Sequence, residues 1–188
     1  ALYFQDEDNI LGTSFMPYLQ NVAGLTGVNY RLEPWTYRED EGCELGNMFT
    51  ACVAADGDPA TPILKAHAGD RVMVNIFGAH NEQNQMFNMD GHQWRRHLNQ
   101  EGSDMIDVQQ FGGGEYIQAF VNAGGTYSNP GTYLWLNART PYQQAGQWGY
   151  FKVLPAGERS ILPLGGAAPK AGKTASKGVG DDVLSMNR

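Results

Sequence analysis

The 188-residue sequence has no apolar run near the roughly 20 residues that a helix needs to span a bilayer, so it predicts no transmembrane segment. It also lacks a block of basic residues, because 13 Lys and Arg stand against 20 Asp and Glu, for a net charge of −7. A surface that neutralises phosphates needs clustered positive charge, which makes nucleic acid a poor candidate partner. No long window keeps the apolar stripe of a helix, and this favours a β-rich fold.

Cysteine is scarce. Cys43 and Cys52 are the only two, and they would close a short disulfide loop in an exported protein or remain two separate buried thiols. The chain does not start with a charged segment followed by an apolar one, so we expect any signal peptide to have been removed and the protein to be extracellular or periplasmic. Residues Leu2–Gln5 match part of a protease site used in expression tags, so we expect no functional role for them.

Glycine and aromatic residues are plentiful, with 24 Gly and 11% Phe, Trp and Tyr. They divide the chain into three zones: a loop-like N-terminal extension at 1–33, a domain at 34–155, and a polar C-terminal tail at 156–188 without aromatic residues. Such extensions are typical of flexible termini. We expect them instead to contact a protein partner or a second copy of the chain.

The middle zone carries alternating apolar and polar residues, which predict short strands. We expect these strands at 62–66, 71–77, 115–121, 132–136 and 149–154, with turns at 112–114 and 130–131. One helical turn is expected after Pro141. Several short strands separated by turns are typical of a β-sandwich or barrel.

Residues 61–72, residues 85–94, and the pair of segments 131–135 and 146–151 together resemble a cupredoxin domain of the multicopper oxidase family. Residues 61–72 resemble its early strands, and residues 85–94 resemble the segment that reads H-P-x-H-x-H-G-H in active members. Residues 131–135 and 146–151 resemble the frame around the terminal H-C-H-x3-H-x4-M/L segment. The likeness covers about 28–155 and is greatest with the final domain of large bacterial, manganese-oxidase-like enzymes. It implies an all-β, cupredoxin-like Greek-key β-sandwich with extended N- and C-terminal segments.

The same resemblance implies that every copper-ligand position is substituted. At the type 1 site, Gln85 replaces the first histidine, Asn137 the cysteine, Tyr142 the later histidine and Gln147 the axial residue. The trinuclear positions hold Asn88, Asp90, Leu136 and Ala138. His92 matches a family histidine that does not bind copper.

Ligand chemistry predicts the consequence of these substitutions. A type 1 site needs a thiolate and two imidazoles, and amides or hydrocarbons do not replace them. We therefore expect no cofactor in this chain, with copper present only where other domains or chains supply it. Amide hydrogen bonds should satisfy Gln85, Asn88 and Gln147, while Leu136, Tyr142 and Trp148 fill the space left by the metal.

Other candidate sites favour ordinary structural roles. His92 and His97, with Asp90 or Asp107, would form a metal site only if loop geometry brought them together, and scattered surface histidines are commoner than ligands. Soft copper(I) binding is an alternative for the group Met73, Met86 and Met89, although packing fits these methionines better. The acidic run at 39–41 fits a solvated loop.

Two functions remain open. In the first, the chain is a copper-free structural or assembly domain, a subunit or fragment of a larger extracellular complex. In the second, it is a domain without the catalytic site in an active multicopper oxidase that acts on metal ions or small reductants, with the acidic run and Asp90 attracting a cation. We favour the first, and assign no catalytic residue in this chain.

Overall fold

The structure is a computed structural model that describes residues 1–6, 26–40, 48–49, 57–79, 83–158 and 160–161. Residues 1–158 form one compact unit, and residues 159–188 form a second. Cys43 and Cys52, for which a disulfide and two separate thiols were both open, and most of the predicted tail lie outside the described residues. In the described part, no helix is long and apolar enough to cross a membrane.

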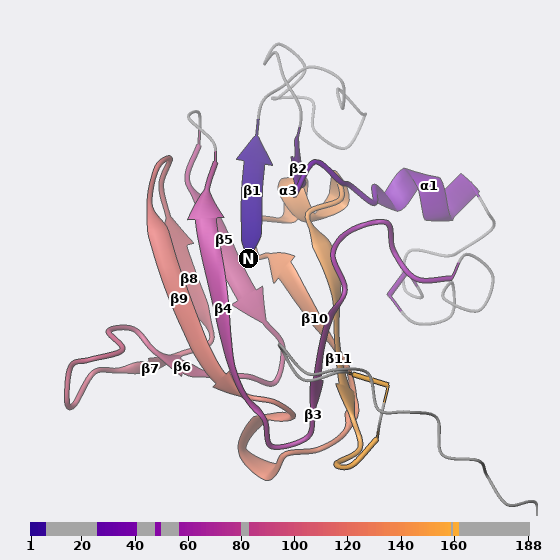
Figure 1. The fold of residues 1–188 in the computed structure, drawn as a ribbon. Coiled ribbons are helices and arrows are strands. Elements are labelled where there is room, and N and C mark those ends of the chain that lie inside the picture. The colour runs from indigo at the N-terminus through magenta and orange to yellow at the C-terminus, as the bar shows by residue number, and fades with distance from the viewer. Residues whose placement is uncertain (7–25, 41–47, 50–56, 80–82, 159, 162–188) are drawn as a thin grey trace, which may run out of the picture. The chain divides into compact units, whose positions relative to one another are not determined.

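The first sheet has four strands in the order β2-β1-β4-β9 (Figure 1). They are β1 (Leu2–Asp6), β2 (Thr26–Val28), β4 (Arg71–Gly78) and β9 (Tyr116–Asn122). Strand β1 lies inside this sheet, parallel to β4 and antiparallel to β2. Strand β9 pairs with β4 and forms one edge.

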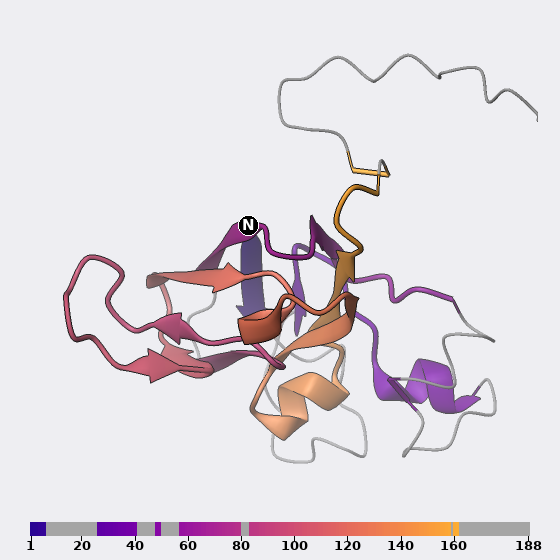
Figure 2. The same cartoon turned by 90° about the horizontal axis from the view of Figure 1, so that it is seen from below.

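The second sheet has five strands in the order β3-β11-β10-β5-β8. They are β3 (Leu64–His67), β5 (Gln85–Met89), β8 (Val108–Phe111), β10 (Gly131–Asn137) and β11 (Trp148–Leu154). A hairpin of β6 (Trp94–Arg95) and β7 (Met105–Ile106) extends away from the two sheets (Figures 1 and 2). The short helices are α1 (Trp35–Asp40), the 3-10 turn η4 (Gly125–Tyr127) and α3 (Thr140–Gln144).

These elements confirm the all-β, cupredoxin-like sandwich. All five predicted strands are present, and α3 begins next to Pro141 as expected. The predicted loop-like character of 1–33 was wrong at β1 and β2. Leu2–Gln5, for which no functional role was expected, are part of the fold, because Leu2 and Phe4 are fully buried.

Phe4 shows why β1 belongs to the core. Its ring meets Phe87, Phe111 and Trp135 of the second sheet, with centroids 6.2, 5.5 and 6.1 Å away. Full burial of one such side chain contributes about 1.5–3 kcal/mol. Two apolar positions in a five-residue strand are too few for alternation to be recognised in the sequence.

The second sheet buries residues on both faces. Its inner face meets the first sheet, while Leu136, Trp148 and Tyr150 form a separate cluster on the outer face. Phe49 packs edge-on against Trp148 at 4.9 Å and against Trp35 of α1 at 5.6 Å. Part of the outer face is therefore covered by the chain that precedes β3.

Candidate functional site

Three of the residues that the resemblance assigns to type 1 positions meet inside the sandwich. Asn137 ends β10, Gln85 begins β5, and Gln147 lies directly before β11. Side chains alternate between the two faces of a strand, and this places all three on the inner side. Each is 0% exposed. We call Gln85, Asn137 and Gln147 the amide cluster.

Asn137 is the centre of the amide cluster. Its Nδ2 donates to Oε1 of Gln85 and to Oε1 of Gln147, the latter at 2.6 Å. Its Oδ1 accepts from the backbone N–H of Arg139 at 3.0 Å and of Met86 at 3.3 Å. Both amide hydrogens and both oxygen lone pairs are thus used, which is the full capacity of a carboxamide.

Gln147 connects the cluster to the first sheet. Its Nε2 donates to the backbone carbonyl of Gln5 in β1 at 2.7 Å and to that of Gly27 in β2 at 3.4 Å. Tyr142, the fourth residue that the resemblance assigns to the type 1 site, is 2% exposed in α3, where the Arg139 guanidinium lies 5.0 Å from its ring centroid. The backbone N–H of Gln147 donates to the Tyr142 carbonyl at 2.9 Å, which closes the loop around α3.

The residues that the resemblance assigns to trinuclear positions lie at the opposite face of the second sheet. Asn88 and Leu136 are direct cross-strand partners, and Leu136 also pairs with Trp148. Asn88 Nδ2 donates to the Asp107 carbonyl at 3.0 Å. Asp90 and Ala138 are exposed. Leu136 and Trp148, which were expected to fill the space left by the metal, pack together on this outer face, away from Gln85, Asn137 and Gln147.

His92 is 1% exposed and hydrogen-bonded through both ring nitrogens. Its Nε2 accepts from the Gly124 backbone N–H at 3.1 Å, so this nitrogen carries no proton. The other nitrogen, Nδ1, therefore donates to the Asp90 carbonyl at 2.8 Å. Burial lowers the pKa of His92, and this effect is larger than the opposite effect of the contacts with Asp90. The neutral ring is therefore a structural part of the fold.

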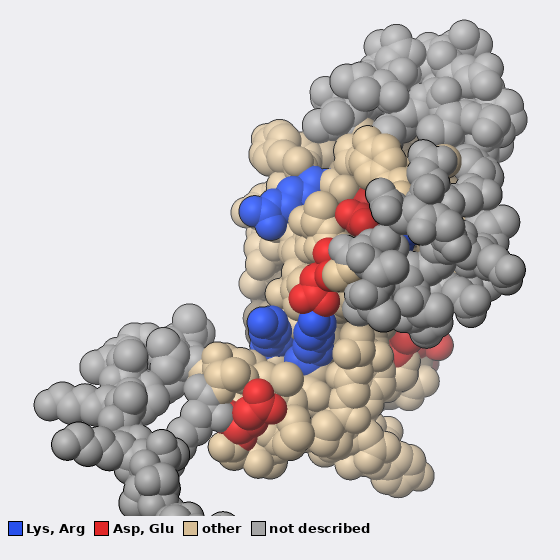
Figure 3. Space-filling view, turned by 90° about the vertical axis from the view of Figure 1, so that its right-hand side faces the viewer, with Lys and Arg blue, Asp and Glu red and all other residues tan. Residues whose placement is uncertain are grey.

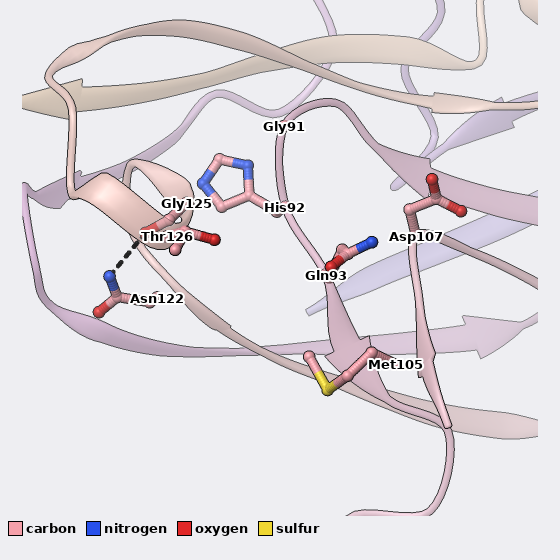
Figure 4. A pocket seen from close by; sticks show the side chains of 8 residues that line it. All are labelled: Gly91, His92, Gln93, Met105, Asp107, Asn122, Gly125 and Thr126. Carbon is pink, nitrogen blue, oxygen red and sulfur yellow. Dashed lines mark hydrogen bonds between the residues drawn. The ribbon is translucent and has the colours of Figure 1, made fainter. Parts of the chain in front are cut away.

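A cavity of about 390 Å³ lies beside His92. Figure 4 shows its ring on the Gly125 side of this cavity, whereas Asp107 comes from the opposite side. The described residues contain no group of three or more His, Cys, Asp or Glu side chains able to hold a metal. His97 is exposed on the loop after β6.

The remaining sequence candidates are dispersed. Met89 is fully buried in the core, Met86 is half-buried, and Met73 is 43% exposed on the first sheet. The side chains of the acidic run at 39–41 lie outside the described residues. Among the described residues on the face drawn in Figure 3, acidic and basic side chains are interspersed.

Arg38 of α1 is a functional candidate that the sequence did not indicate. It is 1% exposed, its Nε donates to Glu33 Oε1 at 3.1 Å, and its guanidinium carbon lies 5.0 Å from the Trp148 ring centroid. Glu33 Oε2 also accepts from the Ala60 backbone N–H at 3.0 Å. This pair fastens α1 to the outer cluster. No pattern signals it, because arginine is normally solvated.

No protein-family model matches this sequence, and no curated protein matches it. Among solved structures, a multi-copper oxidase from Pediococcus acidilactici matches 83% of this chain and 26% of its own, at 7% identity and a TM-score of 0.51. A multicopper oxidase from Campylobacter jejuni, described as a metallo-oxidase, matches 81% of this chain and 29% of its own, at 13% identity and a TM-score of 0.51. The chain thus spans less than a third of either oxidase. Identities this low show the fold alone: a cupredoxin-like domain similar to those of multicopper oxidases.

Proposed function

We propose that this chain is a copper-free cupredoxin domain with a structural role in a larger extracellular or periplasmic assembly. It packs against a protein partner or a second copy and stabilises it. The observation that carries the proposal is the amide cluster: buried, mutually hydrogen-bonded carboxamides occupy positions where the resembling family has copper ligands.

The chemistry of the cluster supports a site without metal. Copper in a type 1 site is held by a thiolate and imidazoles, whereas a carboxamide offers a neutral, hard oxygen. Both lone pairs of the Asn137 oxygen already accept backbone hydrogen bonds. A metal bound there would displace these donors, and each buried group left unpaired costs about 1–3 kcal/mol.

The connections of Gln147 support a structural role. At the position of the family's axial ligand, this residue donates instead to backbone carbonyls of β1 and β2. It therefore joins the loop between β10 and β11 to strands of the other sheet. The hydrogen bonds of Gln147 thus stabilise the packing of the two sheets.

Metal loading tests the proposal. The full chain is incubated separately with copper(I) and copper(II), desalted, and measured by mass spectrometry for copper and by absorption for a thiolate-to-copper band. We expect neither stoichiometric copper nor a blue colour. The matched control is the same chain with Gln85→His, Asn137→Cys, Tyr142→His and Gln147→Met, which restores the type 1 donor set and should turn blue if it folds. One tightly bound copper per unaltered chain would refute the proposal.

A second function is suggested by the length of the similar oxidases, which are much longer than this chain. Each is an oxidase of which this chain matches 26% or 29%. In this alternative, the chain is a domain without the catalytic site in an active multicopper oxidase that acts on metal ions or small reductants. Copper found in the native assembly but not in the isolated chain would favour this alternative. Copper in neither would favour the first proposal.

A further inference from the structure

A groove of about 560 Å³ lies alongside β9, bordered by the loop that follows β6. Strand β9 is an edge strand, and the β6–β7 hairpin extends from the sandwich on the same side (Figures 1 and 2). The volume is within the usual range of ligand sites, about 300–1,000 Å³. The side chains that matter here are Arg96, Asn99, Gln100, Gln109, Tyr116 and Gln118. The groove shares no residue with the amide cluster, so it is independent of the proposed function.

Tyr116 presents an aromatic ring to the groove in a fixed position. Its hydroxyl donates to Asn75 Oδ1 at 2.8 Å. One side of the ring stacks on Phe77 at 4.7 Å between centroids, and Phe77 stacks in turn on Tyr3 at 4.7 Å. The Tyr116 side chain is nevertheless 47% exposed. Since Phe77 covers one side, the opposite side of the ring is left to meet a ligand.

Two amides in the groove are held in defined orientations. The indole N–H of Trp94 can only donate, so the Gln109 oxygen faces it at 3.3 Å and the Gln109 NH₂ points elsewhere. Gln118 Nε2 donates to Asn75 Oδ1 at 3.1 Å, which leaves its oxygen as an acceptor. Within the described residues, no hydrogen bond uses Gln109 Nε2 or Gln118 Oε1. The groove therefore offers one oriented donor and one oriented acceptor.

Charge is the third feature of the groove. Its lining contains no Asp or Glu although the whole chain carries −7. Arg96 lies in the lining and makes no ion pair within the described part of the chain. An unpaired guanidinium is suited to a carboxylate, which it binds through two parallel hydrogen bonds.

We infer that this groove binds an acidic oligosaccharide, a chain of pyranose rings that carry carboxylates. The C–H face of a pyranose packs on the electron-rich face of an aromatic ring such as Tyr116. A sugar hydroxyl both donates and accepts, and this matches the donor of Gln109 and the acceptor of Gln118. Arg96 pairs with a carboxylate. Tyr116 and both amides are held before the ligand arrives, and this reduces the ordering cost of binding.

A polar peptide is the competing occupant, since an edge strand such as β9 can pair with an extended chain. That mode uses backbone groups, and it explains neither the oriented amides nor the stacked ring. The observations therefore favour the sugar.

The test is calorimetric titration of the full chain with hexagalacturonate and with the neutral cellohexaose. We expect hexagalacturonate to bind, and Tyr116→Ala to weaken it about tenfold, as the loss of one aromatic stacking contact does. Arg96→Gln should weaken the binding of hexagalacturonate and leave the titration with cellohexaose unchanged. Tyr116→Phe should keep most of the affinity. The control is Tyr127→Ala, which removes a tyrosine that is 84% exposed outside the groove lining and should change nothing.

Gln109→Glu is a second variant in case Tyr116→Ala does not fold. It keeps an oxygen for Trp94 and adds a negative charge, so hexagalacturonate binding should be lost. No binding of hexagalacturonate to the unaltered chain would overturn the inference, as would binding that is indifferent to both Tyr116→Ala and Gln109→Glu. Binding of a polar peptide along β9, seen as slowed amide exchange there without any response to sugar, would overturn it in favour of the peptide.

Discussion

Asn137 and Gln147 are ten positions apart in the sequence, yet Nδ2 of the first lies 2.6 Å from Oε1 of the second, in a site where both are 0% exposed. The Asn137 backbone N–H also donates to the Gln147 carbonyl at 2.9 Å. Side chain and backbone thus close the same loop, the one that contains α3. The amide pair therefore closes the loop between β10 and β11, and Gln147 Nε2 separately joins this loop to the Gln5 carbonyl of the first sheet.

Asn137→Ala should therefore destabilise the fold strongly. The change removes the donor for Gln85 and Gln147 and the acceptor for two backbone N–H groups. At about 1–3 kcal/mol for each unsatisfied buried group, we expect the free energy of unfolding to fall by at least about 3 kcal/mol. Urea unfolding followed by tryptophan fluorescence measures it. The exposed Asn129→Ala is the control, and equal losses in the two variants would contradict a structural role for the cluster.

Whether a strand can be predicted from the sequence depends on its length and on how regularly its buried and exposed residues alternate. The alternation of Val72, Val74 and Ile76 is long enough to identify β4, and the five predicted strands were found. β5 was not predicted from alternation, because Gln85 and Asn88 put polar residues on both of its faces. β1 was missed because its two buried residues make too short a pattern.

The amide cluster was predictable only through the resemblance to cupredoxin domains. That likeness selects Gln85, Asn137 and Gln147 from distant parts of the chain, and the structure brings them together. No propensity or spacing indicates that these amides bond to one another. The role of Arg38 was hidden for another reason, since its burial depends on Trp148 and Glu33, which are far from each other in the sequence.

Replacing Gln147 by Leu should loosen β1 selectively. The substitution removes the donor for the Gln5 carbonyl in β1 and the Gly27 carbonyl in β2. We expect amide hydrogen exchange to become faster in β1 and β2, while amides between β10 and β11 keep their protection, because local opening follows local contacts. Mass spectrometry of deuterium uptake measures this. Gln144→Leu in α3 is the control, and uniform acceleration in all strands would contradict a specific link to β1.

Arg38→Met should weaken the attachment of α1 to the outer cluster. The change leaves Glu33, 15% exposed, without its cation, and removing one partner of a buried pair costs about 3–5 kcal/mol. Glu33→Gln added to Arg38→Met should recover part of this loss, because no unpaired charge remains. Denaturant unfolding of the two single variants and the double variant measures the coupling. Strictly additive losses would show that the two side chains do not interact.

Protonation of His92 should make the fold less stable in mild acid. Burial lowers the pKa of His92 in the folded chain, so from the ordinary value of 6.5 downward the unfolded chain binds more protons and folding stability falls with pH. Asp90 acts in the opposite sense, since burial raises its pKa above 3.8 and the folded chain takes up that proton first at lower pH. The His92 effect should therefore dominate between about pH 7 and 5, where histidine normally titrates. The free energy of unfolding, measured by denaturant at several pH values in this range, should change less with pH for His92→Gln than for the parent. The exposed control His97→Gln should keep the parent's dependence on pH. A parent slope that survives His92→Gln would assign the acid sensitivity to another group.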